Sequence, residues 1–433
     1  MCAESSGIEK CCSAVLCRRW EGFSMMHVTF IHNPAVGHSS WTGSLRARWI
    51  QVSVERSQNS TGSRVNETSM PLLRQFRQRL FLLVGLALAC LVMASLMLIG
   101  NEPSKPVEWH HVSAEQKQQV HKYVHKVLEG ECRLRGSRQS LLSLLPASSR
   151  AMQPFLWRDK VLPDNLFQYP PPFGFRGLEG KVEDLLDQLP AEVESQSEES
   201  AGRCRRCVVV GNGGILKGLE LGPLIDRFDT IIRLNSGPLG EFVPDVGNRT
   251  SFRMSYPEGT PIRWVDRDPH TLFVAVVYKS VDLSWISAMV NKLAVSLWDW
   301  LFFWQKVPKE IPLDPHRFRL LNPLVIKETA LDLLKYPTPR PVLWGWDQNV
   351  PTLGVSALNL ASLLCDEVSL AGFGYNLPHQ NVPLHYYDHQ PIGVMQKQTM
   401  HNVDTETRLL QSLVKGHTIT DLTGGIYCSF CSS

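Results

Sequence analysis

Several common nucleotide-binding signatures are missing from this chain of 433 residues. It has no GxxxxGK sequence followed by Ser or Thr, which argues against ATP or GTP hydrolysis, and no GxGxxG turn, which argues against a nicotinamide dinucleotide. The net charge is only +3, so nucleic acid is not an expected partner. No internal repeat is present, which excludes solenoids and propellers.

Long apolar runs are also scarce, and Leu80 to Gly100 is the one candidate for a transmembrane helix. It holds 21 residues without a charge, which matches a bilayer span of about 20 residues. Arginines crowd its N-terminal side, so the positive-inside rule places residues 1–79 in the cytosol. We expect an unstructured cytosolic tail (1–79), a signal-anchor helix (80–100), a short stem (101–111) and a lumenal catalytic domain (112–433). A buried core helix is the alternative for 80–100.

Cysteines are unevenly distributed, and an even number follows the expected span. These six are Cys132, Cys204, Cys207, Cys365, Cys428 and Cys431. In an oxidising lumen they indicate disulfides, with fifteen connectivities open to them. Two Cys-x-x-Cys pairs leave a zinc site as the alternative. Asn248 begins the one sequon on the expected lumenal side and is the candidate glycan acceptor.

The most informative stretch runs from Cys207 to Asn212, where a β-branched strand ends at Gly211 and a glycine-rich turn follows. Such a turn lets the backbone approach a phosphate. Strands and helices then alternate, which predicts a single α/β lumenal domain with a central, mostly parallel sheet flanked by helices. Ligands in such sheets bind at the carboxyl ends of strands. The expected elements are strands at 208–210, 230–234, 272–277 and 368–371, and helices at 113–130, 180–189, 216–227 and 357–365.

Side chains that can bind a nucleotide follow these expected strands. Asn212 and Asn235 each come after a strand and carry amides that can contact phosphate or sugar. Asn is equally common as a left-handed turn residue, so that reading stays open. Asp266 and Asp268 form an Asp-x-Asp pair that can hold Mg²⁺, but a solvated charged turn before Pro269 is favoured.

Two histidines near the C-terminus each have a carboxylate nearby, since Asp388 follows His385 and Glu406 follows His401. Histidine is the usual side chain for taking a proton near neutral pH. An inert surface role is the alternative for each. A separate aromatic run, Trp298 to Trp304, is expected to lie in the core, the alternative being an apolar face toward a membrane or a lipid-linked acceptor.

Four of these segments, in this order, resemble the motifs of the animal sialyltransferase family. Cys207 to Gly259 resembles its long donor-binding motif, and Val350 to Gly374 resembles its short motif. His385–Asp388 resembles the third motif and His401–Glu406 the very short one. The resemblance covers roughly residues 112–433. It departs from the family at Ile215, where relatives often carry Asn, and near Val350, where they often carry Tyr.

The resemblance implies a chemistry and a set of roles. The donor would be CMP-sialic acid and the product inverted, with no metal. His401 would be the general base, His385 would stabilise the departing phosphate, and Glu406 would orient the site. The residues implied for donor binding are Asn212, Gly213, Asn235, Thr352, Leu353 and Gly354. The implied disulfides are Cys207–Cys365 and, upstream, Cys132–Cys204.

Within the family, the segments Leu219–Gly222, His385–Asp388 and Asp421–Gly425 most resemble those of members that act on a galactose-terminated glycolipid. The resemblance implies lactosylceramide as the acceptor, sialylated at O3. The protein would then be a single-pass type II enzyme of the Golgi membrane, with cycling through the endoplasmic reticulum and a homodimer as further expectations. Other galactose-terminated glycolipids or glycoproteins are alternative acceptors. A lumenal carbohydrate-binding protein without catalysis is the alternative from another functional class.

Overall fold

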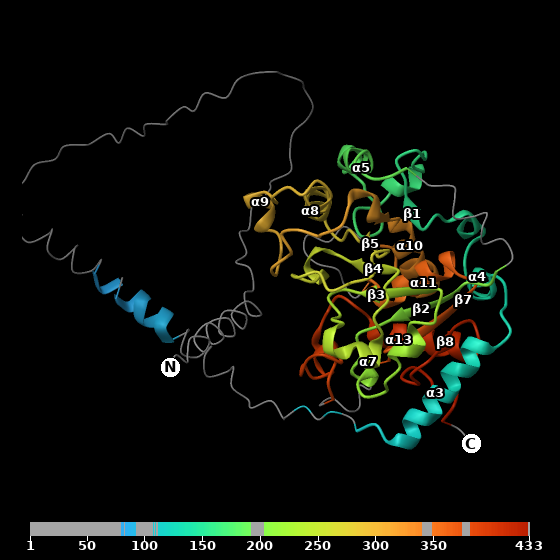
Figure 1. Ribbon diagram of the computed structural model, residues 1–433. Helices are drawn as coiled ribbons and strands as arrows, with labels where there is room; N and C mark the ends of the chain where they lie inside the picture. The colour runs from blue at the N-terminus through green and yellow to red at the C-terminus, as the bar shows by residue number, and fades with distance from the viewer. Residues whose placement is uncertain are drawn as a thin grey trace, which may run out of the picture. The chain divides into compact units, whose positions relative to one another are not determined.

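A computed structural model describes residues 79–81, 83–91, 107, 109, 111–191, 203–339, 349–374 and 382–431. The chain divides into two compact units, residues 1–100 and 101–433. In the first unit, residues 79–81 and 83–91 are helical, drawn in blue in Figure 1. The tail, most of the stem and the remainder of the expected span lie outside the described residues. Among the residues described, none of the helices is both long and apolar enough to cross a bilayer.

The second unit is built on one eight-stranded sheet with the order β1-β6-β5-β4-β3-β2-β7-β8. Every neighbouring pair is parallel except β1 with β6, so the expected mostly parallel sheet is confirmed. The strands are β1 (Phe155–Leu156), β2 (Arg206–Val210), β3 (Thr230–Leu234), β4 (Phe252–Ser255), β5 (Leu272–Ala275), β6 (Phe318–Leu321), β7 (Glu367–Ala371) and β8 (Thr420–Asp421).

Helices cover both faces of this sheet. The α-helices are α3 (Ala114–Glu129), α4 (Gly136–Leu142), α5 (Glu179–Leu186), α6 (Gly222–Ile225), α7 (Val243–Val246), α8 (Ser280–Val290), α9 (Leu297–Trp300), α10 (Pro323–Lys327), α11 (Leu353–Leu364), α12 (Val394–Lys397) and α13 (Val403–Lys415). The π-helix is η8 (Glu328–Leu333), and the short 3-10 turns are η1 (Ala147–Ala151), η2 (Asp164–Phe167), η4 (Gly214–Leu216), η5 (Gly240–Phe242), η6 (Pro257–Gly259) and η7 (Pro315–Arg317).

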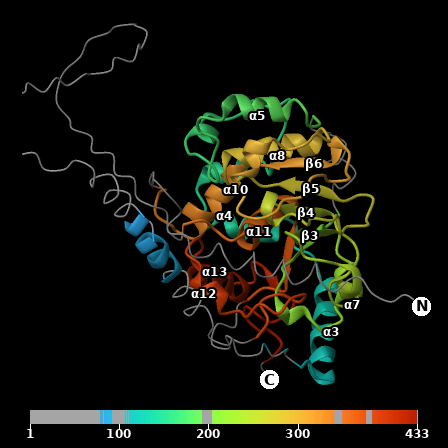
Figure 2. The same cartoon turned by 90° about the vertical axis from the view of Figure 1, so that its left-hand side faces the viewer.

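Alternation along β2 divides the buried side chains between two cores. Cys207 and Val209 pack with α11 and α13, whereas Val208 and Val210 pack with α3, α6 and α7. Figure 2 shows α11 and α13 on one side of the strands and α3 and α7 on the other. A third core joins β5 and β6 to α5 and α8. Successive side chains of a strand point to opposite faces, so one buried strand serves two cores.

The winding of the chain reverses at β2. From β2 it proceeds through β3, β4, β5 and β6 in one direction, whereas β7 and β8 lie on the other side of β2. The turns after β2 and β7 therefore open side by side, and the Gly213 N–H donates to the Gly372 carbonyl oxygen at 3.0 Å. A reversal of this kind leaves a crevice outside the carboxyl ends of the two strands, where ligands bind in open α/β sheets.

Local sequence signals predicted some elements closely and others poorly. Helix α3 begins after Ser113, whose hydroxyl accepts a hydrogen bond from the Gln116 N–H at 3.1 Å, and it ends before Gly130. The prediction of a helix at 216–227 was wrong. Gly218 and Glu220 have positive φ angles of 81° and 52°, which interrupt it and leave only α6.

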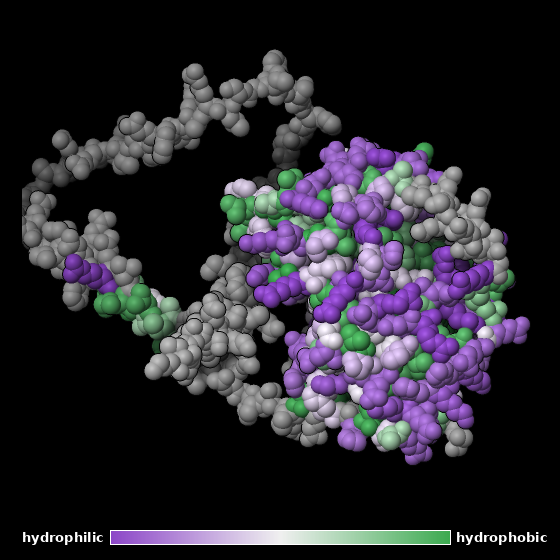
Figure 3. Space-filling view, in the orientation of Figure 1, coloured by the Kyte–Doolittle hydropathy of each residue, from purple (hydrophilic) through white to green (hydrophobic). Residues whose placement is uncertain are grey.

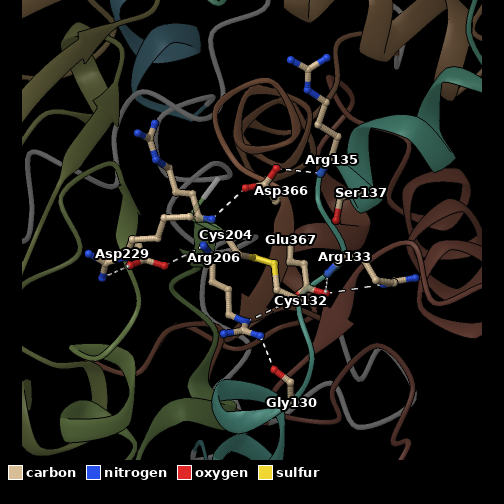
Figure 4. Close-up of a disulfide and its surroundings, with 12 residues drawn as sticks. Gly130, Cys132, Arg133, Arg135, Ser137, Cys204, Arg206, Asp229, Asp366 and Glu367 are labelled. Atoms are coloured by element: carbon tan, nitrogen blue, oxygen red, sulfur yellow. Dashed lines mark hydrogen bonds and ion pairs between the residues drawn. A yellow bond between two sulfur atoms is a disulfide. The ribbon is translucent and has the colours of Figure 1, made fainter. Parts of the chain in front are cut away.

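A disulfide and a polar network lie at the amino ends of β2 and β7, across the sheet from the crevice (Figure 4). Cys132 pairs with Cys204, and the Asp366 carboxylate accepts hydrogen bonds from the backbone N–H groups of Arg135 and Arg205 at 2.7 and 2.8 Å. Two further disulfides are Cys207–Cys365 and Cys428–Cys431. Cys132–Cys204 and Cys207–Cys365 are the pairs that the resemblance implies. The described strands, cores and disulfides all lie within residues 101–433, a compact unit with its own core that we expect to fold alone.

Candidate active site

The glycine-rich turn after β2 packs against two other turns at the carboxyl edge of the sheet. Gly211 donates its N–H to Ala371 and Gly214 to Leu384, at 2.8 and 3.1 Å. A short antiparallel bridge pairs Gly213 with His385. A Cβ at Gly213 would lie 2.5 Å from the carbonyl oxygen of Gly372, so only glycine fits this packing. The turn therefore places His385 beside the first strand of the donor-binding motif.

Asn212 and Asn235 lie at the ends of neighbouring strands, β2 and β3. The side-chain amide of Asn212 donates to the Leu234 carbonyl oxygen at 3.4 Å, and the backbone carbonyl of Asn212 accepts the Tyr386 N–H at 3.0 Å. Asn235 has a φ of 50°, and its side-chain oxygen accepts a hydrogen bond from the Ser255 hydroxyl. Asn235 is thus a left-handed turn residue, the alternative reading of its type, and its position still faces the same edge as Asn212.

His385 is held by its own loop. Its Nδ1 lies 2.8 Å from an Asp388 carboxylate oxygen, and its ring stacks on Tyr387 with the planes 3° apart and the centroids 5.0 Å apart. Both side chains of the His–Asp pair are about a quarter exposed, at 27% and 29%. A carboxylate oxygen only accepts, so Nδ1 carries a proton in this contact and donates it to Asp388. This arrangement suits a group that faces a developing negative charge.

Glu406 joins the start of α13 to the start of α11. Its two carboxylate oxygens accept hydrogen bonds from the Thr352 backbone N–H at 2.7 Å and from the Thr352 hydroxyl at 2.6 Å. Burial raises the pKa of Glu406 to about 7, against the lowering effect of these two bonds. Thr352 is the N-cap of α11, so Glu406 fixes the position from which Leu353 and Gly354 start the helix.

His401 lies five residues before Glu406, directly before Asn402, the N-cap of α13. Its Nδ1 lies 2.8 Å from the Val350 carbonyl oxygen. A carbonyl oxygen only accepts, so Nδ1 carries the proton and Nε2 keeps its lone pair. Burial lowers the pKa of His401, although the bond to Val350 opposes this. The result is a neutral imidazole with a free basic nitrogen near neutral pH.

The ring of Phe373 connects the two groups of residues. A Cβ at Gly211 would lie 3.1 Å from this ring, and a Cβ at Gly354 would lie 2.8 Å from it. The turn after β2 and the N-terminus of α11 therefore pack on the same side chain. Sequence reasoning did not single out Phe373, although its place between Gly372 and Gly374 directly after β7 was a usable signal.

The Asp266 carboxylate is buried and bonded to other side chains, so it is not part of a solvated turn. Its carboxylate oxygens accept hydrogen bonds from Arg253 Nε and Nη2 at 2.8 and 2.6 Å, and from the Thr250 hydroxyl at 2.6 Å. The side chains of Asp266 and Arg253 are fully buried. Arg253 also donates to the carbonyl oxygens of Asn235 and Gly237. The expectation of a solvated charged turn was wrong for Asp266, which anchors the arginine that supports the Asn235 turn.

Metal-ligand geometry elsewhere in the described residues is confined to one group, Cys132, Cys204 and Glu367. The two cysteines are joined as a disulfide, so neither offers a thiolate. The alternative of a zinc site made from the Cys-x-x-Cys pairs is likewise wrong, because Cys204, Cys207, Cys428 and Cys431 are all in disulfides. Asn248, the candidate glycan acceptor, is exposed.

The expectation that the aromatic run lies in the core is wrong for most of its members. Only Trp300 and Phe303 pack against a core, whereas Trp298 and Trp304 are 76% and 70% exposed. Leu301 and Phe302 between them are exposed as well.

Comparisons with known proteins identify the family of this chain. The sequence model of glycosyltransferase family 29 (sialyltransferase) matches residues 155–418. Lactosylceramide alpha-2,3-sialyltransferase of Mus musculus is 47% identical over 319 residues, which cover 73% of this chain and 77% of that protein. The enzyme of the same name from Homo sapiens is 48% identical over 318 residues, 73% of this chain and 76% of that protein.

More distant relatives share the fold. CMP-N-acetylneuraminate-beta-1,4-galactoside alpha-2,3-sialyltransferase of Homo sapiens is 36% identical over 298 residues, 69% of this chain and 78% of that protein. A crystal structure of a mammalian sialyltransferase superimposes with a TM-score of 0.50 at 25% identity, covering 63% of this chain and 90% of the other. With a family match over more than half of its length, this chain belongs to glycosyltransferase family 29, the sialyltransferases.

Proposed function

We propose that this chain transfers sialic acid from CMP-sialic acid to O3 of the terminal galactose of lactosylceramide, with inversion at the anomeric carbon. The observation that carries this proposal is the bond from His401 Nδ1 to the Val350 carbonyl oxygen, which leaves Nε2 unprotonated. Nε2 takes the proton of galactose O3, and that oxygen forms a bond to the anomeric carbon of the sialyl group. The bond from that carbon to the phosphate oxygen of CMP breaks at the same time.

Donor binding is assigned to the carboxyl edge of β2 and β3 together with the start of α11. Asn212, Gly213 and Asn235 lie on the first side, and Thr352, Leu353 and Gly354 on the second. Members of the family use CMP-sialic acid, and a phosphate fits both a glycine-rich turn and the free N–H groups at a helix start. Val350 contributes its backbone carbonyl to His401, and Ile215 carries no polar group, so neither side chain supplies a phosphate contact.

Two other side chains complete the proposed reaction. His385, paired with Asp388, faces the charge that develops on the departing phosphate. Glu406 acts through Thr352 and is a positioning residue rather than a participant in the chemistry. No metal has a role in this scheme, since a monophosphate leaving group carries less charge than a diphosphate. The proposal is supported by the engagement of Asp266 with Arg253.

The acceptor assignment rests on the difference in sequence identity between two groups of relatives. Identity is 47–48% to enzymes named for lactosylceramide and 36% to one named for beta-1,4-galactosides. We also propose a type II topology, with residues 1–79 cytosolic, 80–100 as the signal-anchor helix, 101–111 as the stem and 112–433 as the lumenal catalytic domain. The location would be the Golgi membrane, with cycling through the endoplasmic reticulum, a glycan on Asn248 and a homodimer as further parts of the proposal.

The test is an acceptor comparison with purified residues 101–433 and CMP-sialic acid. Lactosylceramide, another galactose-terminated glycolipid and a desialylated glycoprotein are offered side by side, and the linkage and anomeric configuration of the product are determined. We expect the highest kcat/KM for lactosylceramide, with the new bond at O3 and inverted configuration. Preference for the glycoprotein would overturn the acceptor assignment. Binding of sugars with no transfer to any acceptor would favour a non-catalytic carbohydrate-binding protein.

A further inference from the structure

One exposed apolar surface has no place in the reaction described above. It is made by the segment around α9, at the margin of the sheet unit, where apolar side chains gather in Figure 3 at the position that α9 has in Figure 1. We call it the α9 patch. Its members are Leu293, Leu297, Trp298, Leu301, Phe302 and Trp304, whose exposed fractions lie between 61% and 86%.

Helical spacing creates this patch. The Ser296 hydroxyl caps α9, and backbone bonds at i to i−3 continue the turns beyond Trp300. Residues three or four apart share a face of such a segment, which groups Trp298 with Leu301 and Phe302. Trp300 and Phe303, also three apart, form an edge-to-face pair at 6.2 Å that packs inward against the core. The inner pair fixes the segment, and the outer residues have no packing role.

The chemistry of the α9 patch is that of a bilayer interface. Tryptophan concentrates at the level of the lipid headgroups, where its ring is buried and its N–H stays near water. The outer face carries Trp298 and Trp304 together with large aliphatic and aromatic side chains. Lys292, Lys306 and Lys309 flank the segment together with Asp299, Glu310 and Asp314, so the rim carries mixed charge and the apolar side chains provide the attraction to a bilayer. A contiguous group of exposed large apolar side chains is typical of an interaction site.

The patch is connected to the edge of the sheet where the candidate site lies. The Lys279 ammonium sits 5.0 Å from the centre of the Phe303 ring, and it also lies 2.7 Å from a Glu258 carboxylate oxygen. Glu258 belongs to η6, directly after β4, on the same carboxyl edge as Asn235. A lipid bound at the patch would therefore adjoin this edge of the catalytic unit rather than the far edge at Cys132–Cys204.

Chain length brings a bilayer within reach of this surface. If residues 80–100 span a membrane, ten residues (101–110) separate the span from residue 111, where the continuously described part of the second unit begins. A fully extended chain of this length spans at most about 35 Å. That distance is comparable to the size of the unit itself, so the tether holds the unit at high effective concentration beside the bilayer.

We propose that the α9 patch docks into the lipid bilayer in which the chain's own segment 80–100 is anchored, and so presents the catalytic unit to acceptors held in that membrane. This inference rests on the proposed function and topology. It assigns lipid recognition to six side chains outside the site that binds the donor.

The first experiment measures vesicle binding directly, without any glycolipid acceptor. Purified residues 101–433, which lack segment 80–100, are mixed with phosphatidylcholine vesicles with and without phosphatidylserine. The variant W298S/F302S/W304S is expected to bind about tenfold more weakly or worse than the unaltered unit. The control L134S/L144S/V161S removes three exposed apolar residues outside the patch and should leave binding unchanged.

A conservative variant separates the loss of the apolar patch from misfolding of the unit. W298F/W304F keeps the patch apolar and should retain vesicle binding, while the quenching of tryptophan emission by brominated lipids falls relative to the unaltered unit. Equal binding by the unaltered unit and W298S/F302S/W304S would overturn the proposal. Loss of a dimer in the triple variant, measured by light scattering, with vesicle binding unaffected, would also overturn it and assign the patch to a second copy of the chain.

Kinetics of the full chain separate this inference from the proposed function. W298S/F302S/W304S should raise the KM for lactosylceramide in vesicles about tenfold, while the KM for CMP-sialic acid and the kcat with a soluble lactoside stay unchanged. Similar losses with the soluble and the membrane acceptor would count against the docking role. If the unaltered chain transfers sialic acid to no galactoside, the proposed function fails, yet the vesicle measurement still decides the docking question.

Discussion

His401 donates a hydrogen bond from Nδ1 to the carbonyl oxygen of Val350 across 2.8 Å, which fixes the tautomer of the imidazole. Since Val350 begins the segment that leads into α11, the same bond ties the candidate base to the proposed donor-binding helix start. We expect His401→Ala to lower kcat by about 10²–10⁴-fold, the usual contribution of a general base. Binding of CMP, measured by calorimetry, should persist. Full transfer by the variant would refute the base assignment.

The pH dependence follows from the environment of the same residue. Burial lowers the pKa of His401 from its ordinary value of 6.5, and the base works only when unprotonated. The acidic limb of the profile of kcat/KM against pH should therefore have its midpoint below pH 6.5, the ordinary value for histidine. An exposed histidine on η7, His316, provides the matched control, because His316→Ala should leave both the rate and its pH profile unaltered.

Glu406 should make stability depend on pH in the unusual direction for a carboxylate. Its pKa is about 7 in the folded protein and near 4.5 when unfolded, so the folded state holds the proton more tightly. Its contribution is fully present below pH 4.5 and is lost as pH rises through about 7, by up to about 3 kcal/mol.

Urea unfolding of the wild type and Glu406→Gln at pH 4.5 and pH 8 tests this. The wild type should gain relative to the variant at the lower pH, and an equal difference at both values would contradict the prediction. Thr352→Ser retains both donors to Glu406 and should behave as the wild type does.

Much of the fold followed from local pattern. The β-branched run 208–210 and the capped segment starting at Ser113 specify β2 and α3 because strand burial and helix capping are short-range effects. The helix expected at 216–227 failed because Glu220 takes a left-handed backbone conformation, and its N–H bonds to the Asp245 carboxylate, a partner 25 residues away. Such a partner cannot be read from local propensity.

The candidate site was also predictable only in part. The residue types at Asn212, His385 and His401 were visible in the sequence, but their supports were not. Arg253 holds the Asn235 turn through a buried pair with Asp266, and Phe373 fills the space between Gly211 and Gly354. These contacts join different strands and loops, so only the folded arrangement of the sheet creates them.

The Cys207–Cys365 disulfide closes a long loop and should contribute strongly to stability. Its cysteines are 158 residues apart, for which loop-closure entropy gives about 5 kcal/mol, against about 1.5 kcal/mol for the separation of 3 in Cys428–Cys431. The double variants C207A/C365A and C428A/C431A, compared by urea unfolding, should differ in that order. A larger loss in C428A/C431A would contradict the argument.

Replacing Asp266 should lower the free energy of unfolding, and its effect should not depend on a metal ion. Asp266→Ala leaves the buried Arg253 without its partner, which costs about 3–5 kcal/mol in comparable buried pairs. Transfer by the wild type should be unchanged by EDTA, and added Mg²⁺ should not rescue the variant. Asp268→Ala is the control, because the Asp268 carboxylate accepts the N–H of the exposed His270 and forms no buried ion pair like that of Asp266 among the described residues. Rescue of Asp266→Ala by Mg²⁺ would restore the metal interpretation of the Asp-x-Asp pair.

Phe373 and Gly354 should be energetically coupled. A Cβ at Gly354 would lie 2.8 Å from the Phe373 ring, so Gly354→Ala must displace the ring or the start of α11. Overpacking of this kind costs about 1–3 kcal/mol. Replacing the ring by the smaller side chain in Phe373→Leu removes the obstacle, so G354A/F373L should recover transfer activity relative to Gly354→Ala alone.

Gly213 supplies the control for this coupling. A Cβ there would lie 2.5 Å from the backbone oxygen of Gly372, which no side-chain substitution removes, so Phe373→Leu should not rescue Gly213→Ala. Transfer rates of the single and double variants form two double-mutant cycles, with coupling in the first and none in the second. Strict additivity in the first cycle would show that the ring does not set the spacing between the β2 turn and α11. Coupling confined to that cycle means that the two halves of the proposed donor site are held at their distance by a single aromatic side chain.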